Sequence, residues 1–436
     1  MTINRSTAPA IQPVKAPEIP KYRMLQLSNG LSICILDCPE YDILKLEVAF
    51  HAGRPEEKQK LTALMTPKLM LEGAAGRTGA NLAEELDFAG ATISSWSWLD
   101  ATGFVVTGLS KYASQILPIV ADVLLRPDFP ERELQTLVQN HLQELQVELD
   151  KVEVLSYRIL TEHLYGSGHP LGYNSTSEDY KALTRASIKA YYEDHLSLEK
   201  AFIIVSGNID RSVEEALERC FGAVLLRERN PELQRSAPIP SPIFPKGKKT
   251  TLQVEHGSGE QASVKMGRLL FNRNHPDFYE MLIVNTIFGG YFGSRLMMNI
   301  REQKGFTYNI YSAIDTYYAS GFFYISTEVN REKTAATIRA IRLEMKKMRE
   351  KPVELEELEM VKNYMAGALL SSLDGPLNKS VSLRTILFEG MGKEGIDRQL
   401  SALKTITPKR IMELANLYLH PEQFLTVVVR PTANVT

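Results

Sequence analysis

The chain carries two series of hydrophobic and polar patterns that follow the same order. Each series starts with a strand-like run and a helical region, and continues with a pair of alternating strand-like runs and a long amphipathic stretch. In the first half these segments are 44–53, 58–72, 91–98, 101–109 and 113–125. In the second half they are 263–272, 276–288, 308–318, 320–329 and 334–345. The order predicts hairpin strands combined with long helices in each half.

Shared landmarks indicate a duplication. Gly103 and Gly321 each precede a phenylalanine and occupy corresponding places, close to half the chain length apart. The run 202–209 corresponds to 424–431 with nearly the same offset in numbering. A repeat of this length is typical of two similar domains. We therefore predict an α+β fold of two tandemly duplicated domains, each an antiparallel or mixed β-sheet with helices packed on one face.

Proline-rich segments divide the chain. A leader at 1–22 and a second cluster at 229–248 hold prolines at a density that excludes helix and central strand. We predict an N-terminal domain at 23–228 and a C-terminal domain at 249–436, with the second cluster as the linker between them. The cleft between the two halves is the expected functional surface, because domain interfaces are a preferred place for binding sites.

Composition and charge narrow the class of protein. The 436 residues include 50 basic and 52 acidic side chains, for a formal net charge of −2, which excludes a generally basic nucleic-acid binder. No stretch reaches the roughly 18 consecutive apolar residues of a membrane span, and the first residues lack the apolar core of a signal peptide. Cys34, Cys38 and Cys220 are too few for a disulfide framework, and the first two are expected as buried, reduced thiols. We expect a soluble cytoplasmic protein.

Common catalytic motifs are missing. The eight histidines include no pair three to five residues apart, so the zinc motifs HxxEH and HExxH are both absent. No G-x-S-x-G elbow and no Cys-His signature is present. The glycine cluster at 288–296 lacks the Lys-Ser/Thr ending of a phosphate-binding loop, which favours glycines that end a helix and allow close backbone approach.

Arg301 and Tyr308 form the first candidate site. They lie on either side of Gly305, where a helix end is expected to turn into a strand. An arginine in such a place is usually a surface ion-pair residue, and a strand tyrosine is usually a packing residue. Together at the mouth of a cleft they would offer a guanidinium and a phenol hydroxyl to a peptide carbonyl that gains negative charge during attack.

A strand at 90–100 is the second candidate. Its polar and aromatic residues suggest small side chains on one side and Trp96 and Trp98 on the other, which suits an edge strand that pairs with an extended peptide. An ordinary sheet edge with polar residues fits the pattern as well. The candidate substrate-binding residues are Ile93, Ser94, Ser95 and Trp96, together with Gly289 and Gly290 of the glycine cluster.

The segment GGYFGSRLMMNIREQKGFTYNIYS at 289–312 is the most specific part of a family resemblance that also includes LSNGLSICILD, VAFHAGRPEE, SGHPLG and VSGNID. In these segments the chain resembles the pitrilysin/insulinase family of zinc peptidases, in the half-length branch that includes processing peptidases. The resemblance implies a LuxS/processing-peptidase-like metallohydrolase fold. In active members an arginine and a tyrosine of this segment contact the substrate carbonyl, and they match Arg301 and Tyr308.

The zinc-binding residues of that family are not matched. Active members bind zinc through the two histidines of HxxEH and a distal glutamate, and the glutamate of the motif activates water. The resemblance places Leu64 and Lys68 at the two histidines and Pro67 at the catalytic glutamate. Counted from Lys68, Glu144 falls at the position of the distal ligand. We expect no metal in this chain, because one carboxylate beside a lysine cannot hold catalytic zinc.

The resemblance therefore implies a non-catalytic subunit of a heterodimeric zinc metalloendopeptidase. Full-length members close two halves like a clamshell, and short members do so as dimers. The partner would be a homologous HxxEH-bearing subunit that holds the zinc and the base, while Arg301 and Tyr308 act in trans on a peptide or unfolded polypeptide. The alternative is a catalytically dead peptide-binding or structural protein of the same fold.

Overall fold

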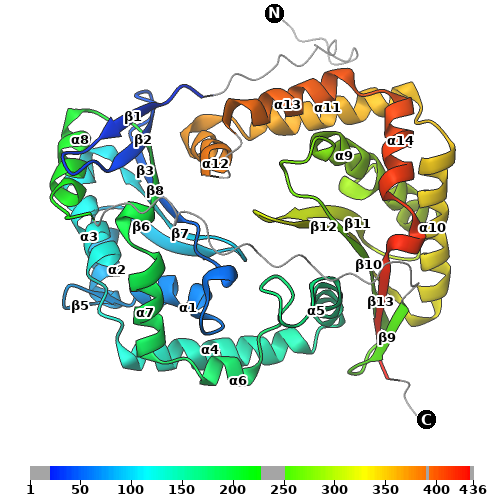
Figure 1. The fold of residues 1–436 in the computed structure, drawn as a ribbon, viewed down its shortest axis with the longest axis horizontal. Coiled ribbons are helices and arrows are strands. Elements are labelled where there is room, and N and C mark those ends of the chain that lie inside the picture. Colours follow the sequence, from blue (N-terminus) through cyan, green and yellow to red (C-terminus); the bar gives the residue numbers. More distant parts are fainter. Residues whose placement is uncertain (1–19, 227–250, 389–391, 433–436) are drawn as a thin grey trace, which may run out of the picture.

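The computed structural model describes residues 20–226, 251–388 and 392–432. The predicted leader at 1–22 lies almost entirely outside these residues, and the predicted linker at 229–248 lies outside them altogether. The described chain forms two α+β halves, which lie side by side in Figure 1.

The first half is built around a six-stranded sheet in the order β1-β2-β8-β3-β7-β6. Its strands, followed by a two-stranded ribbon, are β1 (Arg23–Gln26), β2 (Ser32–Asp37), β3 (Ile43–Phe50), β6 (Thr92–Ser97), β7 (Thr102–Leu109), β8 (Phe202–Gly207), β4 (Gly73–Ala74) and β5 (Arg77–Thr78). Its helices are α1 (Thr62–Met70), α2 (Gly79–Phe88), α3 (Ala113–Leu125), α4 (Glu131–Leu149), α5 (Val152–Tyr165), α6 (Ser177–Lys181), α7 (Arg185–His195) and α8 (Arg211–Leu217). The predicted strand pair and the amphipathic stretch after it are confirmed as β6, β7 and α3.

The second half is built around a five-stranded sheet in the order β11-β12-β10-β13-β9. Its strands are β9 (Thr251–Glu255), β10 (Gln261–Leu270), β11 (Ile310–Thr316), β12 (Gly321–Asn330) and β13 (Leu425–Arg430). Its helices, followed by two π-helical segments, are α9 (Phe278–Asn285), α10 (Thr334–Glu350), α11 (Leu355–Ser371), α12 (Gly375–Phe388), α13 (Gly392–Thr405), α14 (Pro408–Tyr418), η6 (Thr286–Gly290) and η7 (Met297–Gln303).

The two sheets share one topology. The series β6-β7-β3-β8-β2 in the first sheet corresponds to β11-β12-β10-β13-β9 in the second, and β1 is an additional edge strand. Each sheet is antiparallel except for one parallel pair, β2 with β8 and β9 with β13. The predicted α+β fold of two duplicated domains is confirmed.

The register of the duplication differs from the expected one. Phe104 points into the core of the first half, whereas Phe322 lies on the opposite face of its own sheet, where α5 packs. The residue that fills the core of the second half is Phe323, one position further along the strand. The two Gly-Phe pairs are therefore not equivalent, because a shift of one residue turns every strand side chain to the other face.

One helix of each half covers the sheet of the other half. Helix α5 packs on β10 and β13, where Leu160 joins a cluster with Tyr324 and Val427. Helix α12 packs on β8, where Leu383 contacts Ile204. Figure 1 shows α5 beside the second sheet and α12 on the side of the first. Each sheet thus carries its own helices on one face, as predicted, and a helix from the other half on the second face.

These two helix contacts differ in chemistry. In the first sheet, Lys45 and Glu47 of β3 are buried with Nζ and Oε1 2.7 Å apart, and Arg384 of α12 donates to Glu47 over 2.7 Å. At the place in β10 that corresponds to Glu47, Gly267 lies under Leu160 of α5. A Cβ on Gly267 would lie 2.9 Å from the Leu160 Cδ2 atom. The α12 contact is thus a buried ion pair, whereas the contact at the corresponding place under α5 is apolar. Elsewhere α5 also makes polar contacts, because Glu153 Oε1 lies 3.9 Å from Lys265 Nζ and Ser156 Oγ lies 2.8 Å from Ser263 Oγ.

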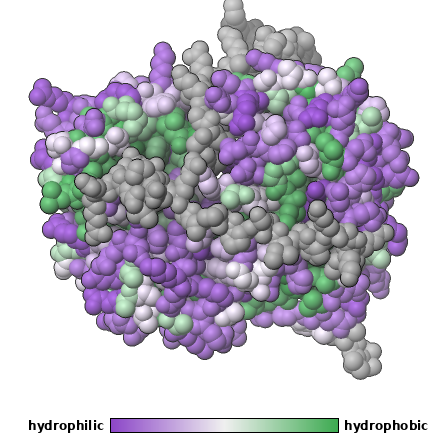
Figure 2. All heavy atoms as spheres, viewed as in Figure 1, coloured by the Kyte–Doolittle hydropathy of each residue, from purple (hydrophilic) through white to green (hydrophobic). Residues whose placement is uncertain are grey.

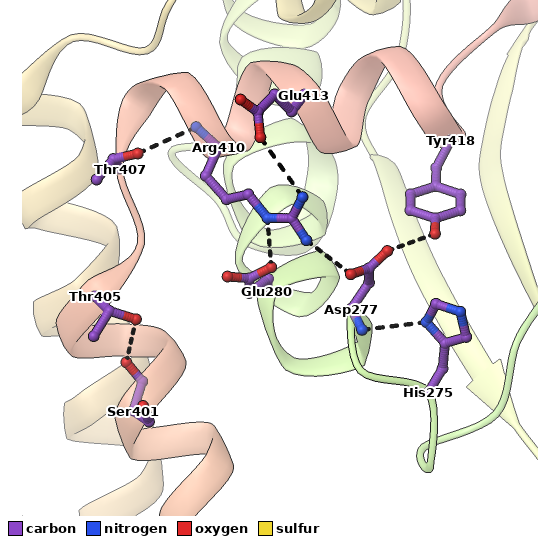
Figure 3. A network of polar contacts seen from close by, with 9 residues as sticks. All are labelled: His275, Asp277, Glu280, Ser401, Thr405, Thr407, Arg410, Glu413 and Tyr418. Carbon is purple, nitrogen blue, oxygen red and sulfur yellow. Dashed lines mark hydrogen bonds and ion pairs between the residues drawn. The ribbon is translucent and has the colours of Figure 1, made fainter.

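Ion pairs also attach α14 to the start of α9, as Figure 3 shows. Arg410 Nη2 lies 2.7 Å from Asp277 Oδ1, and its Nε lies 2.8 Å from Glu280 Oε2. Tyr418 donates its hydroxyl to the other Asp277 oxygen over 2.6 Å. Burial lowers the pKa of Arg410, but the hydrogen bonds to Glu280 and Asp277 outweigh this effect and raise the pKa above its usual value. The network fixes the last helix against the core of its half.

The expected burial of Cys34 and Cys38 is confirmed. Cys34 and Cys38 are buried, Cys220 is half-buried, and all three are free thiols. Burial raises the pKa of Cys34 to about 11. No helix among the described residues is long and apolar enough to cross a membrane. Hydrophilic residues cover most of the face in Figure 2, with hydrophobic residues in smaller patches.

Candidate functional site

Arg301 and Tyr308 line the same open groove on the second half. Its free volume is about 490 Å³. The groove lies where η7 ends, between the loop into β11 and the ends of β10 and β12. Its lining residues are Glu260, Gln261, Arg301, Glu302, Gly305, Phe306, Thr307, Tyr308, Glu328, Val329 and Asn330.

Arg301 projects from the π-helical segment η7, a type of distortion that is frequent at functional sites. The segment is attached to α10, because Asn299 Nδ2 donates to the buried Glu344 over 2.6 Å. Arg301 Nη1 donates to Glu302 Oε1 over 2.8 Å, and its guanidinium carbon lies 4.6 Å from the centre of the Phe292 ring. The Arg301 side chain is 29% exposed. The charged group is thus held in place and remains accessible.

A tight turn carries the chain from Arg301 to Tyr308. Gly305 has φ +63°, in the left-handed region that favours glycine, and its N–H donates to the Arg301 carbonyl over 3.0 Å. Thr307 attaches the turn to β12 by donating its hydroxyl to the Glu328 carbonyl over 2.6 Å. Tyr308 is 88% exposed, so it has no packing role in this chain and its phenol is available to a bound molecule.

Carboxyl groups make up much of the groove wall. Glu260, Glu302 and Glu328 line it together with Arg301. Burial raises the pKa of Glu328, and the nearby carboxyl of Glu153 raises it further, against the opposing effect of Lys265. The groove thus combines the Arg301 guanidinium with three carboxyl groups, one of which is Glu302, its hydrogen-bond partner.

The residues that the sequence analysis places at the zinc-ligand positions lie on α1 and α4. On α1, Leu64 packs against the first core and Pro67 is buried inside the helix. On α4, His141 Nδ1 lies 2.7 Å from Glu144 Oε2. Burial lowers the pKa of His141, and the ammonium of Lys68 lowers this pKa further. Lys68 of α1 is therefore near His141 of α4.

This set of side chains does not fit a zinc ion. Leu64 has no donor atom, Lys68 carries a positive charge of its own, and the single carboxylate of Glu144 already bonds His141. Within the described ranges, no group of three or more His, Cys, Asp and Glu side chains is arranged to hold a metal. The donor chemistry at these positions is therefore incompatible with the zinc site of active members.

Strand β6 is an edge strand, as predicted, and within the described sheet it pairs with β7 alone. Ser94 and Trp96 face one side of the sheet, while Ile93 and Ser95 face the other, where Ile93 packs against the first core. The expected separation of small residues from tryptophans is wrong, because Trp96 shares its face with Ser94. The rings of Trp96 and Trp98 pack together with centres 4.6 Å apart.

Gly289 and Gly290 end the π-helical segment η6. A Cβ on Gly289 would lie 2.5 Å from Ser312 Oγ, so this glycine allows the helix to approach β11 closely. Neither glycine is among the residues that line the Arg301 groove. The close backbone approach favoured by the sequence analysis is present at this position.

A second cavity of about 480 Å³ lies where the two halves meet. Its walls come from His51, the turn between β6 and β7, the β11–β12 hairpin and Phe388. Asp100 accepts a hydrogen bond from the Tyr318 N–H over 2.8 Å, and burial raises the pKa of Asp100. The sequence analysis expected a functional surface between the halves, and of these residues it named Trp98, as part of the strand at 90–100. Only the fold brings the two turns together, because Asp100 and Tyr318 lie in different halves of the chain.

The duplicated α+β halves, with an altered helix α1 in the first and an exposed arginine and tyrosine in the second, define a protein of the two-domain metallopeptidase class. Family models agree with this class. The description "Insulinase (Peptidase family M16)" matches residues 37–168, and "Peptidase M16 inactive domain" matches residues 182–365. The chain belongs to the insulinase family, peptidase family M16.

Curated relatives match over nearly their full length. An uncharacterized zinc protease of Bacillus subtilis is 24% identical over 412 residues, which cover 93% of this chain and 98% of that protein. An uncharacterized zinc protease of Rickettsia bellii is 26% identical over 404 residues, which cover 90% of this chain and 91% of that protein.

Solved structures share the fold. A protease from Helicobacter pylori has a TM-score of 0.84 at 17% identity, over 95% of this chain and 100% of that one. A peptidase M16 inactive domain from Pseudomonas fluorescens has a TM-score of 0.82 at 22% identity, over 94% and 98%. The periplasmic protease PqqL from Escherichia coli has a TM-score of 0.77 at 16% identity, over 98% of this chain but 49% of that one. This chain thus corresponds to about half of the PqqL chain.

Proposed function

We propose that this chain is the non-catalytic subunit of a heterodimeric zinc metalloendopeptidase and that it supplies Arg301 and Tyr308 in trans. One observation carries the proposal: Arg301 and Tyr308 share an open groove. The family resemblance adds that Leu64, Pro67 and Lys68 of α1 take the positions at which active members hold zinc and the catalytic base. The groups that would act on the substrate are present, and the groups that would activate water are replaced.

The chemistry of the groove suits a peptide carbonyl. When such a carbonyl is attacked, its oxygen gains negative charge, and a guanidinium with a phenol hydroxyl can donate hydrogen bonds to it. Because Tyr308 is 88% exposed, this chain alone does not exclude water from the groove. A second surface is needed to close it, and we propose that this surface is a homologous HxxEH-bearing subunit that holds the zinc and the base.

The length of the chain supports a complex of two subunits, and the thiols indicate its compartment. The match covers 49% of the PqqL chain, so a second unit of this fold would bring the complex to about the length of that protein. The free thiols Cys34, Cys38 and Cys220 suit a reducing compartment, and we propose that the complex works in the cytoplasm. Its substrate would be a peptide or an unfolded polypeptide small enough to enter.

The test uses the complex of this chain with an HxxEH-bearing homologue from the same genome, obtained by co-expression and assayed with an internally quenched peptide. Arg301→Ala and Tyr308→Phe are each expected to lower kcat by roughly 10²–10³, the usual effect of removing one oxyanion donor. The chain alone is expected to cleave nothing and to hold no stoichiometric zinc by metal analysis.

Matched controls remove the same groups elsewhere. Arg211→Ala removes a guanidinium that is 92% exposed and pairs with Glu215 on α8, and Tyr41→Phe removes an exposed phenol. Both controls should retain full activity. Unchanged cleavage by Arg301→Ala and Tyr308→Phe would contradict the role in trans. A stable homodimer with no affinity for the homologue would instead favour the peptide-binding or structural alternative.

A further inference from the structure

An exposed aromatic side chain lies against the guanidinium of the groove. Phe292 is 64% exposed, although it is a large apolar residue. The guanidinium carbon of Arg301 lies 4.6 Å from the centre of its ring, within the range of a cation–π contact. The side chain is therefore placed where it contacts a charged group rather than a hydrophobic core.

The loop that carries Phe292 is anchored on both sides to helix α11. On one side, the rings of Tyr291 and Tyr364 lie with centres 5.0 Å apart. On the other side, Arg295 forms a two-pronged ion pair with Glu357, with distances of 2.9 and 2.7 Å. Phe292 lies between these two anchors, so the loop holds its ring at a fixed place beside the groove.

Two contacts then restrain the Arg301 side chain. The guanidinium carbon lies over the Phe292 ring, 4.6 Å from its centre, and Glu302 accepts a hydrogen bond from Nη1 over 2.8 Å. A guanidinium carries five N–H donors in a fixed plane, so fixing that plane fixes the direction of the donors that remain. A long arginine side chain otherwise loses considerable conformational entropy when it binds.

We propose that Phe292 is a positioning residue, which holds the plane of the Arg301 guanidinium so that its remaining N–H groups point into the groove. This inference rests on the proposed function, because it concerns the same donors. Phe292 thus links the loop after Gly289 and Gly290 to the groove, although neither glycine lines the groove itself. When a partner closes over the groove and removes water, the ring contact strengthens, because cation–π contacts gain when they are desolvated.

The test compares Phe292→Leu, which removes the ring but keeps an apolar side chain, with Phe292→Tyr, which keeps the ring. In the complex with the HxxEH-bearing subunit, Phe292→Leu should lower kcat by about 3- to 30-fold with little change in KM, because the lost alignment acts in the transition state. Phe292→Tyr should restore kcat to within about twofold of the parent. Phe88→Leu, at a phenylalanine of α2 that is 90% exposed, is the matched control and should change neither constant.

Two further measurements separate positioning from other roles. In an Arg301→Ala background, Phe292→Leu should cause no additional loss, because the ring acts through Arg301. In the chain alone, the side-chain proton resonances of Arg301 should show an upfield ring-current shift that Phe292→Leu removes and Phe292→Tyr keeps.

The outcomes distinguish the two proposals. If Arg301→Ala lowers kcat but Phe292→Leu leaves kcat and the resonances unchanged, the positioning role is wrong and the proposed function stands. A full loss from Phe292→Leu in the Arg301→Ala background would also overturn the positioning role, because the ring would then act on the substrate directly. If Arg301→Ala leaves kcat unchanged, the proposed function fails, and the positioning role fails with it.

Discussion

At the scale of single residues, the loop before α1 holds two neighbouring carboxyl groups that are half-buried. Glu56 accepts a hydrogen bond from the Gly53 N–H over 2.8 Å. Glu57 accepts one from the Ala63 N–H over 2.9 Å and one from the Tyr173 hydroxyl over 2.5 Å. Burial raises the pKa of Glu56 to about 7 and also raises the pKa of Glu57. Ionising these groups therefore opposes folding near neutral pH.

The sign of the pH dependence follows from Glu56. Its carboxyl binds a proton more tightly in the folded chain, with a pKa of about 7 against 4.5, so its contribution to stability falls as pH rises through this interval. Glu56→Gln keeps the hydrogen-bond acceptor and removes the titration. Between pH 5 and pH 8 the parent should lose up to about 3 kcal/mol more stability than the variant, measured as the shift of the urea unfolding midpoint. Equal pH slopes for the two proteins would contradict this prediction.

The sequence was least informative about which residues of the two halves correspond to each other. The repeat of a glycine and a phenylalanine suggested that Phe104 and Phe322 correspond, but the structural counterpart of Phe104 is Phe323. A strand alternates its faces at every residue, so a match between residue types cannot fix the register without the partner strands. For the site, the sequence located Arg301 and Tyr308 correctly on one turn, because Gly305 and the family-like pattern are local features. It did not single out Phe292, because the contact with Arg301 spans a loop.

At the scale of elements, α1 and α4 bring close together the positions that the family resemblance assigns to zinc ligands. The helices contact each other, and Lys68 of α1 influences His141 of α4, one turn from Glu144. Pro67 lies inside α1, where it removes a backbone donor without ending the helix. We therefore expect that the side chains at these positions, rather than the arrangement of the two helices, exclude zinc.

This expectation can be tested by restoring the ligands. The combined substitutions Leu64→His, Pro67→Glu and Lys68→His should give a chain that binds one zinc ion per molecule, with Glu144 as the distal ligand. Metal analysis after dialysis measures the stoichiometry. The same three substitutions with Glu144→Gln should bind zinc more weakly by at least tenfold. No zinc binding by the folded triple variant would mean that α1 and α4 have moved out of the metal-binding arrangement.

Elements with a clear period were predictable, and their partners were not. The amphipathic stretch at 113–125 coincides with α3, because its apolar face has a strong helical period. The sequence does not indicate that α5 and α12 cover the sheet of the opposite half. An apolar helix face shows that something is packed against it, but its partner is decided by contacts that are distant along the chain.

At the scale of the whole molecule, the buried group of Lys45, Glu47 and Arg384 joins the two halves. Removing Glu47 would leave two cations buried without a counter-charge, so Glu47→Gly should lower the free energy of unfolding by about 3–5 kcal/mol. The double variant Glu47→Gly with Arg384→Leu copies the contact of Gly267 with Leu160. It should recover the part of that loss that comes from Arg384, while Lys45 stays without its counter-charge.

Urea unfolding midpoints of the single and double variants measure this coupling, and Glu47→Gln separates the loss of charge from the effect of glycine in a strand. A double variant that is less stable than Glu47→Gly alone would show that the two helix contacts are not interchangeable. The comparison uses the duplication itself as the control, because the second half already contains the contact of Gly267 with Leu160 at the corresponding place.

Helix α5 of the first half covers the second sheet, and helix α12 of the second half covers the first sheet. This arrangement determines when the chain can complete its fold during synthesis. The first sheet receives its last strand at β8, which ends at Gly207, but the face that includes Ile204 stays uncovered until α12 begins at Gly375. Helix α5 must wait still longer, until β13 has left the ribosome. Contacts this distant in sequence form slowly and leave apolar surface exposed in the meantime. A nascent chain that stalls before Gly375 is therefore a client for chaperones, even though its first domain is fully translated.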